Sequence, residues 1–229
     1  MEKIKEPYIR DLLILHGLFA IFTIVALILP LGVQIGPRLF VLVIAYNLMI
    51  PIGGYYWGHR DWIALWSFSF LVSLFMIFPD WFLAAELGVL VFPADGLFKI
   101  GPVSGYMAGL WTIPIFIIVF IGREIQKNHS YMKSYLVVAI LSLVIFFTAE
   151  ATMWMLPSWY AQNVAMIGPV AIYIIIPEII LGITAHVAYD IIIERSVFAY
   201  ILAAFSVMII YMGTISFFHL LIEKIILGV

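Results

Sequence analysis

Four carboxyl groups lie within long apolar runs of this chain, where an acid is costly and therefore points to function. Glu86 and Glu150 each stand seven residues before a proline, in matched Ala-Glu-x6-Pro patterns. Asp80 and Glu178 each directly follow a proline. A proline inside a helix frees a backbone carbonyl that protein or water must satisfy, which fits an internal cavity better than a lipid-facing surface. A desolvated carboxyl group in such a cavity can stay protonated and act as an acid.

The segment Ile-Gly-Pro occurs three times, starting at Ile35, Ile100 and Ile167, so that the copies lie 65 and 67 residues apart. Each copy follows a hydrophobic-Pro step and precedes an Ile-Pro step. A fixed period with the same punctuation predicts repeated units, here two helices and the turn between them. Because Glu86 and Glu150 occupy the same repeat position, we expect both to face one cavity if the repeats pack around a pseudo-axis.

Composition assigns the chain to the membrane. Of its 229 residues, 66% are apolar and only 10% are charged, which is typical of transmembrane helices. A net charge of −2 gives no indication of a nucleic-acid partner. The chain has no cysteine, which excludes a disulfide framework, a thiol nucleophile and a thiolate metal site.

The predicted fold is an all-α integral membrane protein with seven transmembrane helices in one domain, residues 1–229. The spans are predicted at about 9–31, 38–57, 62–92, 102–122, 131–156, 169–190 and 197–222. The repeats comprise about 9–57, 62–122 and 131–190, followed by the extra helix at 197–222. The first apolar run has the place of a signal peptide, but it is interpreted as the first helix of repeat 1.

Two details of the spans follow from proline. The third span is too long for one straight helix, so Pro79 is predicted to kink it, or to divide it into a helix to Phe78 and a half-buried piece to Phe92. The even-numbered spans are expected to begin just after Gly-Pro, because proline at the first helical position loses no hydrogen bond.

Positive charge predicts the orientation. Eight Lys and Arg residues fall on one side of the predicted spans and three on the other. This bias places the N-terminus in the cytoplasm and the C-terminus outside. All three Ile-Gly-Pro turns are then expected on the outer side.

Aromatic side chains stand near the acids. Aromatic faces stabilise a cation by roughly 0.5–2 kcal/mol each. An acid beside them could protonate a carbon–carbon double bond, and the aromatic faces would hold the resulting carbocation. Alternatively, any one of these aromatic residues lies at a membrane interface or packs between helices. The candidates for substrate binding are Phe82, Trp81, Tyr106, Trp111, Trp154 and Tyr173.

His186 and Asp190 are four residues apart and can touch across one helical turn, and Glu178 shares that face. This pattern fits a proton path, but an interfacial helix-end pair is the favoured interpretation. No two histidines have a spacing of three or four residues, so no histidine metal site and no cofactor are predicted, while a mixed Glu/His site stays open.

Repeat 3 contains Trp159, an Ile-Gly step at Ile167 and an Ile-Pro-Glu step ending at Glu178 that lies in an apolar helix, with Arg195 at the helix end. This order resembles the lycopene cyclase domain of membrane carotenoid cyclases, in which a Pro-x-Glu-Glu or similar motif opens such a helix. Here Ile179 follows the glutamate in place of a second acid.

Repeat 2 contains an Ala-Glu step at Glu86, then Phe92-Pro93 and Ile113-Pro114. It is similar in outline to the membrane-bound carotenoid hydratases. Both groups protonate an isoprenoid double bond, so the resemblance implies a proton-donating role for Glu178 and, by looser analogy, for Glu86 and Glu150. Asp80 completes the set of candidate catalytic acids.

Three functions stay open. The first is a membrane enzyme that cyclises, isomerises or hydrates an isoprenoid or carotenoid-like lipid by protonating a double bond. The others are a small transporter or proton-coupled carrier, since repeats with broken helices are typical of transporters, and a non-catalytic lipid-binding bundle. A microbial-type rhodopsin is excluded, because residues 197–222 contain no lysine for a Schiff base and Lys224 lies beyond them. The expected partners are a hydrophobic substrate and membrane lipids.

Overall fold

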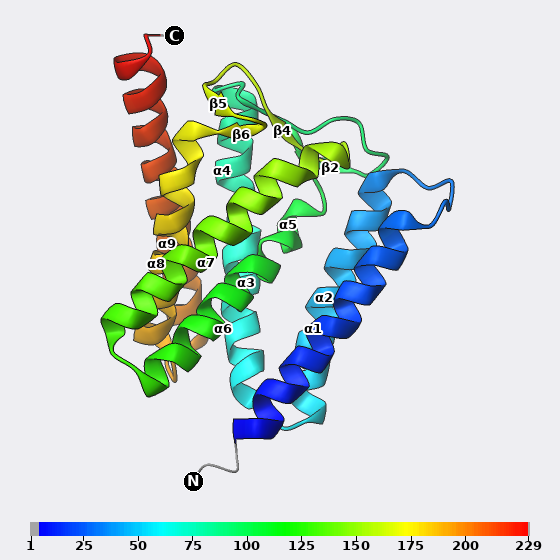
Figure 1. Cartoon of the computed structure of the whole chain (residues 1–229), viewed down its shortest axis with the longest axis vertical. Coiled ribbons are helices and arrows are strands. Elements are labelled where there is room, and N and C mark those ends of the chain that lie inside the picture. Colours follow the sequence, from blue (N-terminus) through cyan, green and yellow to red (C-terminus); the bar gives the residue numbers. More distant parts are fainter. Residues whose placement is uncertain (1–4, 229) are drawn as a thin grey trace.

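The computed structural model of the protein describes residues 5–228 as a bundle of long helices with short strand pairs at one end (Figure 1). Seven helical segments among these residues are long and apolar enough to cross a membrane. The all-α fold class predicted from the sequence is thereby confirmed. The segments are Pro7–Ile28, Ile35–Tyr56, Arg60–Glu86, Met107–Asn128, Tyr131–Met155, Ile172–Ile192 and Val197–Ile226.

Most connections between the helical elements are short, but residues 87–106 and 156–171 form two longer connections that carry the strands. They are α1 (Lys5–Ile28), α2 (Ile35–Tyr56), α3 (Arg60–Phe75), α4 (Ile77–Trp81), the π-helix η2 (Phe82–Glu86), α5 (Met107–Leu110), α6 (Thr112–Asn128), α7 (Tyr131–Thr152), the 3-10 helix η3 (Met153–Met155), α8 (Ile172–Ile192), α9 (Val197–His219) and the π-helix η4 (Leu220–Ile226). The two-residue strands are β1 (Leu90–Val91), β2 (Lys99–Ile100), β3 (Val103–Ser104), β4 (Tyr160–Ala161), β5 (Met166–Ile167) and β6 (Val170–Ala171).

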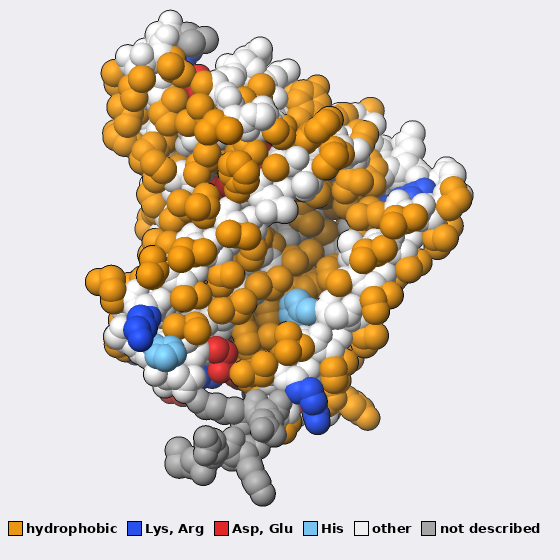
Figure 2. Space-filling view, in the orientation of Figure 1, with side chains coloured by type: hydrophobic (Ala, Val, Ile, Leu, Met, Phe, Trp, Pro, Cys, Tyr) orange, Lys and Arg blue, Asp and Glu red, His pale blue; other side chains and the backbone are white. Residues whose placement is uncertain are grey.

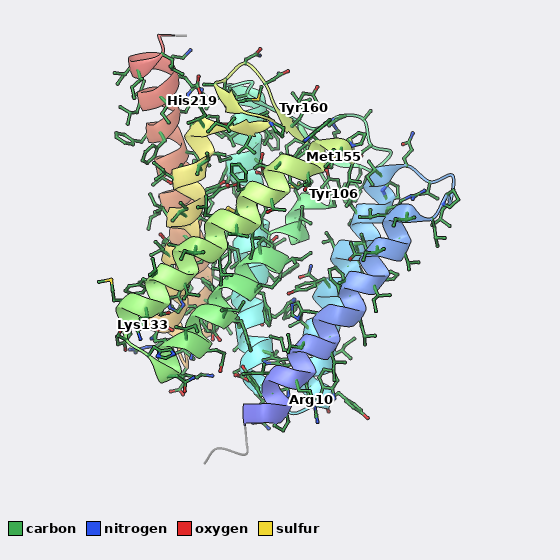
Figure 3. The ribbon with its side chains drawn as sticks, in the orientation of Figure 1. Arg10, Tyr106, Lys133, Met155, Tyr160 and His219 are labelled. Carbon is green, nitrogen blue, oxygen red and sulfur yellow. The ribbon has the colours of Figure 1, made fainter. Side chains whose placement is uncertain are left out.

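All the strands lie at one end of the bundle, which we call the hairpin end; the opposite end, where the first described residues lie, is the N-terminal end (Figure 1). Arg10 and Lys133 both lie toward the N-terminal end (Figure 3). Lys3, which also counts toward the positive-charge bias, lies outside the described residues. The orientation of the two ends across a membrane stays a prediction.

Large apolar side chains cover the outside of the helices, as lipid contact requires. On α1, for example, Leu13, Leu18 and Ile28 are 67%, 59% and 75% exposed. Figure 2 shows apolar side chains over most of the visible face, with the few charged groups on it mainly toward the two ends. Helices that are apolar on every face suit a lipid environment on one side and a bundle core on the other.

The bundle is organised around α8 and α3. Helix α8 packs against α9, α7 and α6, while α3 packs against α9, α2 and α6. Helix α1 packs chiefly on α2, and this pair diverges from α3 and α4 toward the hairpin end (Figure 1). The bundle core therefore consists of α3 and α6 to α9, and the α1–α2 pair lies at its side.

The third span is interrupted close to the predicted place. Helix α3 ends at Phe75 and α4 starts at Ile77. Because Pro79 has no N–H to donate to the carbonyl four residues earlier, the regular helix breaks at that level. The span does not continue to residue 92: it ends at Glu86, and Gly88 then turns the chain with a φ of +66°.

The second and third Ile-Gly-Pro segments form β-hairpin turns and do not begin helices. They connect β2 to β3 and β5 to β6. Gly101 and Gly168 have φ values of +60° and +61°, at the first of two turn positions, where a type II′ hairpin requires glycine. The helices therefore begin further along the chain, at Met107 and Ile172. Only the first segment lies in a helix, in the first turn of α2, so the expectation of helices starting after Gly-Pro fails for the other two.

A third strand pair joins the ends of two spans. Strand β1 pairs with β4 in antiparallel register, with Leu90 opposite Ala161. The Gln162 side chain donates a hydrogen bond of 3.0 Å to the carbonyl of Gly88, and its backbone N–H donates one of 2.9 Å to the carbonyl of Val89. These bonds fix the loop after η2 against the loop after α7, and both loops border the site described next. The three-repeat organisation itself stays a prediction.

Candidate functional site

Three of the four candidate acids line one cavity of about 240 Å³ within the bundle core. Asp80 comes from α4, Glu150 from α7 and Glu178 from α8. Asp80 and Glu178 are each only 3% exposed. Carboxyl groups that are far apart in the sequence thus converge on one cavity.

The rest of the cavity lining is apolar or aromatic. The indole of Trp111 packs on Phe146 and Tyr211, with ring centroids 5.5 and 5.8 Å apart. Phe92 and Trp159 line the cavity from the loops at the hairpin end. The acids therefore face aromatic surfaces, with few polar groups beside them.

Asp80 is held by an indole. The Nε1–H of Trp111 donates a hydrogen bond of 3.2 Å to Oδ2 of Asp80. The backbone N–H of Asp80 donates to the carbonyl of Met76 at 3.2 Å, which continues the helix across the interruption before α4. The carboxyl group is thus oriented by a residue of the α5–α6 junction.

Glu150 is held by a second indole. The Nε1–H of Trp159 donates a hydrogen bond of 2.9 Å to Oε1 of Glu150. The loop that carries Trp159 is fixed in turn, because the Ser158 hydroxyl donates to the Met153 carbonyl at 2.7 Å and the Tyr106 hydroxyl donates to the Ser158 carbonyl at 3.0 Å.

Glu178 differs from the other two acids. It is buried on α8 directly after Pro177, and among the described residues no indole donates to it as Trp111 and Trp159 do to the others. Glu150 lies within electrostatic range of both Glu178 and Asp80. Three carboxyl groups that line one apolar cavity repel one another when they are charged.

Glu86 does not join this cluster. Its side chain is exposed and does not line the cavity, which corrects the prediction of a cavity shared by Glu86 and Glu150. Glu150 lies in the regular helix α7, whereas Glu86 ends a π-helix in which the N–H of Leu87 bonds to the carbonyl of Phe82 at 3.0 Å. The wider π turn changes the direction of the side chains that follow it.

The predicted aromatic residues divide into several groups. Trp111 lines the cavity, while Phe82 is half-buried away from the lining. Trp81 is 40% exposed and lies against Gly101 of the β2–β3 turn. Trp154 is 48% exposed and donates its indole N–H to a backbone carbonyl of its own helix turn. These last three are corrections to the predicted substrate-binding set.

Tyr106 and Tyr173 are buried beside the cavity without lining it. Figure 3 shows Tyr106 near Met155, at the end of the span that carries Glu150, and its hydroxyl supports the Trp159 loop as described above. Burial raises the pKa of the Tyr106 phenol well above its usual value, so it stays a neutral hydrogen-bond donor. Tyr173 packs edge-on against His219 with ring centroids 5.2 Å apart. Both tyrosines support the site and do not contact the cavity.

Four aromatic residues of the cavity lining were absent from the predicted set, namely Phe92, Phe146, Trp159 and Tyr211. Tyr211 lines the cavity from α9 and is 1% exposed. It stands near the middle of its span, far from either interface belt, and a tyrosine in that place is itself a signal. Phe146 stands four residues before Glu150 on α7, so helical spacing alone would have placed it on the same face.

Within residues 5–228, no three His, Asp or Glu side chains lie close enough together to hold a metal ion. His186 and Asp190 do approach each other, with Nε2 3.9 Å from Oδ2. Asp190 also pairs with Arg123 at 3.3 Å. These groups lie near the C-terminal end of α8, which points to the N-terminal end of the bundle, and they do not line the cavity.

One family model matches residues 77–222, from α4 into η4, and this range includes all three cavity acids. Helices α1, α2 and α3 lie outside the match. No curated protein and no solved structure matches the chain. Because the match covers more than half of the sequence, the chain belongs to the family described as "Domain of unknown function (DUF6989)".

Proposed function

We propose that this protein is a multi-pass membrane enzyme that acts on an isoprenoid or carotenoid-like lipid by protonating a carbon–carbon double bond. The observation that carries the proposal is the convergence of Asp80, Glu150 and Glu178 on one apolar, aromatic cavity. Intramembrane acids are functional by default, and three of them in one cavity supply both a proton donor and a proton acceptor.

The geometry favours Glu178 as the donor. The indole N–H groups that bond to Asp80 and Glu150 favour the charged, accepting form of those carboxyls. Glu178 shares the cavity without such an indole donor, so it is the acid best able to hold a proton. Among the three acids it is also the one whose Ile-Pro-Glu context resembles the lycopene cyclase domain.

The reaction balances within the cavity. Glu178 transfers H⁺ to one carbon of the double bond, and the other carbon becomes a carbocation. The faces of Trp111 and Tyr211 stabilise that cation by roughly 0.5–2 kcal/mol each. Loss of a proton from a neighbouring carbon to Glu150 or Asp80 gives an isomer, directly or after attack of a second double bond closes a ring. Addition of water followed by loss of its proton gives an alcohol.

The cavity volume limits what is held there. Pockets that enclose a whole drug-sized ligand measure about 300–1,000 Å³, whereas this cavity measures about 240 Å³. A long isoprenoid would place only its reacting segment beside the acids, and the remaining chain would lie in the membrane or along the bundle.

The test is mass spectrometry of lipid extracts from an isoprenoid-rich host that expresses the wild type or single variants. We expect a wild-type product that is isomeric with a host isoprenoid or heavier by one water. Glu178→Gln should abolish it, and Glu150→Gln and Asp80→Asn should reduce it strongly, because general acid–base catalysis contributes about 10²–10⁴-fold.

Glu86→Gln is the matched control, because Glu86 is an acid of the same type in the same predicted pattern but lies outside the cavity. It should leave the product unchanged. Undiminished product in all three cavity variants would contradict the proposal. Proton-coupled uptake in proteoliposomes without any new product would indicate a transporter instead, and loss of co-purified lipid alone would indicate a lipid-binding bundle.

A further inference from the structure

A line of polar groups runs along α8 from the cavity to the N-terminal end of the bundle, which is where α8 has its C-terminus. Glu178, His186 and Asp190 stand on one face of the helix, eight and four residues apart. The intervening position on that face is Gly182. Helix α8 is otherwise strongly apolar, so three ionisable groups on one of its faces call for an explanation.

His186 is fully buried and has one unused nitrogen. Its Nε2 lies 3.0 Å from the Ser134 hydroxyl oxygen, and that hydroxyl donates its proton to the Gly122 carbonyl at 2.7 Å. The Ser134 oxygen must therefore accept from Nε2–H, which leaves the lone pair on Nδ1. Nδ1 is buried and has no hydrogen-bond partner among the described residues. An unsatisfied buried acceptor is costly and is often kept for function.

Ser142 fills the gap between His186 and the cavity. A Cβ atom on Gly182 would lie only 1.8 Å from the Ser142 hydroxyl oxygen. The hydroxyl therefore occupies the place of the missing side chain, one helical turn from Glu178 and one from His186. It donates to the Val138 carbonyl at 2.7 Å, and its lone pairs can still accept a proton from a neighbour.

Asp190 connects this line to water. Its side chain is 23% exposed, lies 3.9 Å from His186 and pairs with Arg123. The groups that face His186 are Asp190 on its own helix, Arg123 of α6, and Ser134 and Tyr135 of α7. A partly exposed carboxyl next to a buried imidazole is an arrangement that can exchange protons with solvent.

We propose that Asp190, His186 and Ser142 form a proton relay between water at the N-terminal end and Glu178 in the cavity. His186 takes a proton at Nδ1 and gives its Nε2 proton to Asp190, and the reverse transfer returns a proton to Glu178 by way of the Ser142 hydroxyl. Successive positions along α8 are one turn apart, a rise of about 5.4 Å, and the side chains of His186 and Asp190 shorten their gap to 3.9 Å. The relay rests on the proposed role of Glu178 as a proton carrier, but its test needs no turnover.

Close helix packing is the structural alternative. Gly122 and Gly182 with Ser134 and Ser142 let α6, α7 and α8 approach one another, as small residues do in membrane bundles. Packing explains the size of these residues, and alanine in place of either serine would serve it equally well. It does not explain an imidazole whose second nitrogen has no partner.

The test follows the carboxyl proton of Glu178 by infrared spectroscopy of the protein in lipid nanodiscs. The C=O band of protonated Glu178 is assigned by its loss in Glu178→Gln, and its shift after transfer into D₂O gives the exchange rate. We expect His186→Phe, which keeps the ring size, to slow exchange by about 100-fold, with recovery on addition of imidazole. Ser142→Ala should also slow it, whereas Ser206→Ala, which removes an exposed hydroxyl on α9, should have no effect.

The outcomes separate the relay from the proposed function. A Glu178 band that exchanges equally fast in all variants would overturn the relay alone, because the proton would then reach Glu178 through the cavity mouth. If no Glu178-dependent band of a protonated carboxyl is present at neutral pH, Glu178 has no proton to donate and the proposed function loses its donor. If His186→Phe does not fold, the comparison of Ser142→Ala with Ser206→Ala decides.

Discussion

The indole nitrogen of Trp159 lies 2.9 Å from Oε1 of Glu150, although the two residues belong to a loop and to the helix before it. Indole can only donate, so this contact commits one carboxyl oxygen as an acceptor. The loop is held by the Ser158 hydroxyl and by Tyr106. The orientation of Glu150 thus depends on structure outside the span that carries it.

Trp159→Phe should weaken the site more than the fold. Phenylalanine keeps most of the aromatic packing but removes the donor, so Glu150 loses its orientation. We expect product formation to fall by at least about tenfold, with a loss of about 0.5–1.5 kcal/mol in the free energy of unfolding, which is typical of one hydrogen bond. Lipid-extract mass spectrometry and thermal unfolding in detergent measure the two effects.

The matched control is Trp154→Phe. Trp154 lies on the same segment, is 48% exposed and donates only to the carbonyl of Ala151. It should change neither product formation nor the melting temperature appreciably. Equal losses of product in the two variants would mean that the Glu150–Trp159 hydrogen bond has no special part in the reaction.

The helices could be predicted from the sequence because a membrane helix satisfies its own backbone, so that length and apolar composition decide it. Irregular positions could not. The Ile-Gly-Pro triplet is identical in all three copies. Even so, Gly36 lies in a helix, while Gly101 and Gly168 lie in hairpin turns. Only the pairing of the flanking residues distinguishes the two outcomes, and pairing is a tertiary property.

The candidate acids were likewise predictable by type and only partly by place. Asp80, Glu150 and Glu178 stood out because charge is rare in apolar spans. The repeat pattern favoured Glu86 as the partner of Glu150, but the π-helix before it points its side chain elsewhere, and Asp80 lines the cavity instead. No residue type marks a π turn in advance. Tyr211 contributes from a helix with no acid near it in sequence, so only the fold brings it to the cavity.

The two hairpin glycines allow the energetic cost of backbone strain to be measured separately from the cost of steric overlap. Gly101→Ala and Gly168→Ala both force a side chain into the left-handed region, which costs roughly 1–2 kcal/mol. At Gly101 the new Cβ would also lie 2.4 Å from the Trp81 ring, whereas at Gly168 nothing lies within 4 Å. We expect Gly101→Ala to be the more destabilising by about 1–3 kcal/mol.

Thermal unfolding of the two variants side by side measures this difference. The double variant Gly101→Ala with Trp81→Ala should recover the steric part alone, since the left-handed φ remains. Equal melting temperatures for the two single variants would show that the exposed Trp81 side chain moves away at no cost.

Filling the cavity should remove the reaction and spare the fold. Ala149 lines the cavity from α7, one residue before Glu150, and a phenylalanine there would extend into the apolar space without contacting water. Because added apolar volume in an existing cavity does not strain its surroundings as it does in a packed core, we expect Ala149→Phe to melt close to the wild type. Product and co-purified lipid should both be lost, as seen by native mass spectrometry.

The control variant Val144→Phe adds a ring on the same helix at a side chain that is 55% exposed, and it should retain both product and co-purified lipid. Retention of product in Ala149→Phe would place the reacting lipid outside this cavity, since a ring and a substrate segment do not fit together in about 240 Å³.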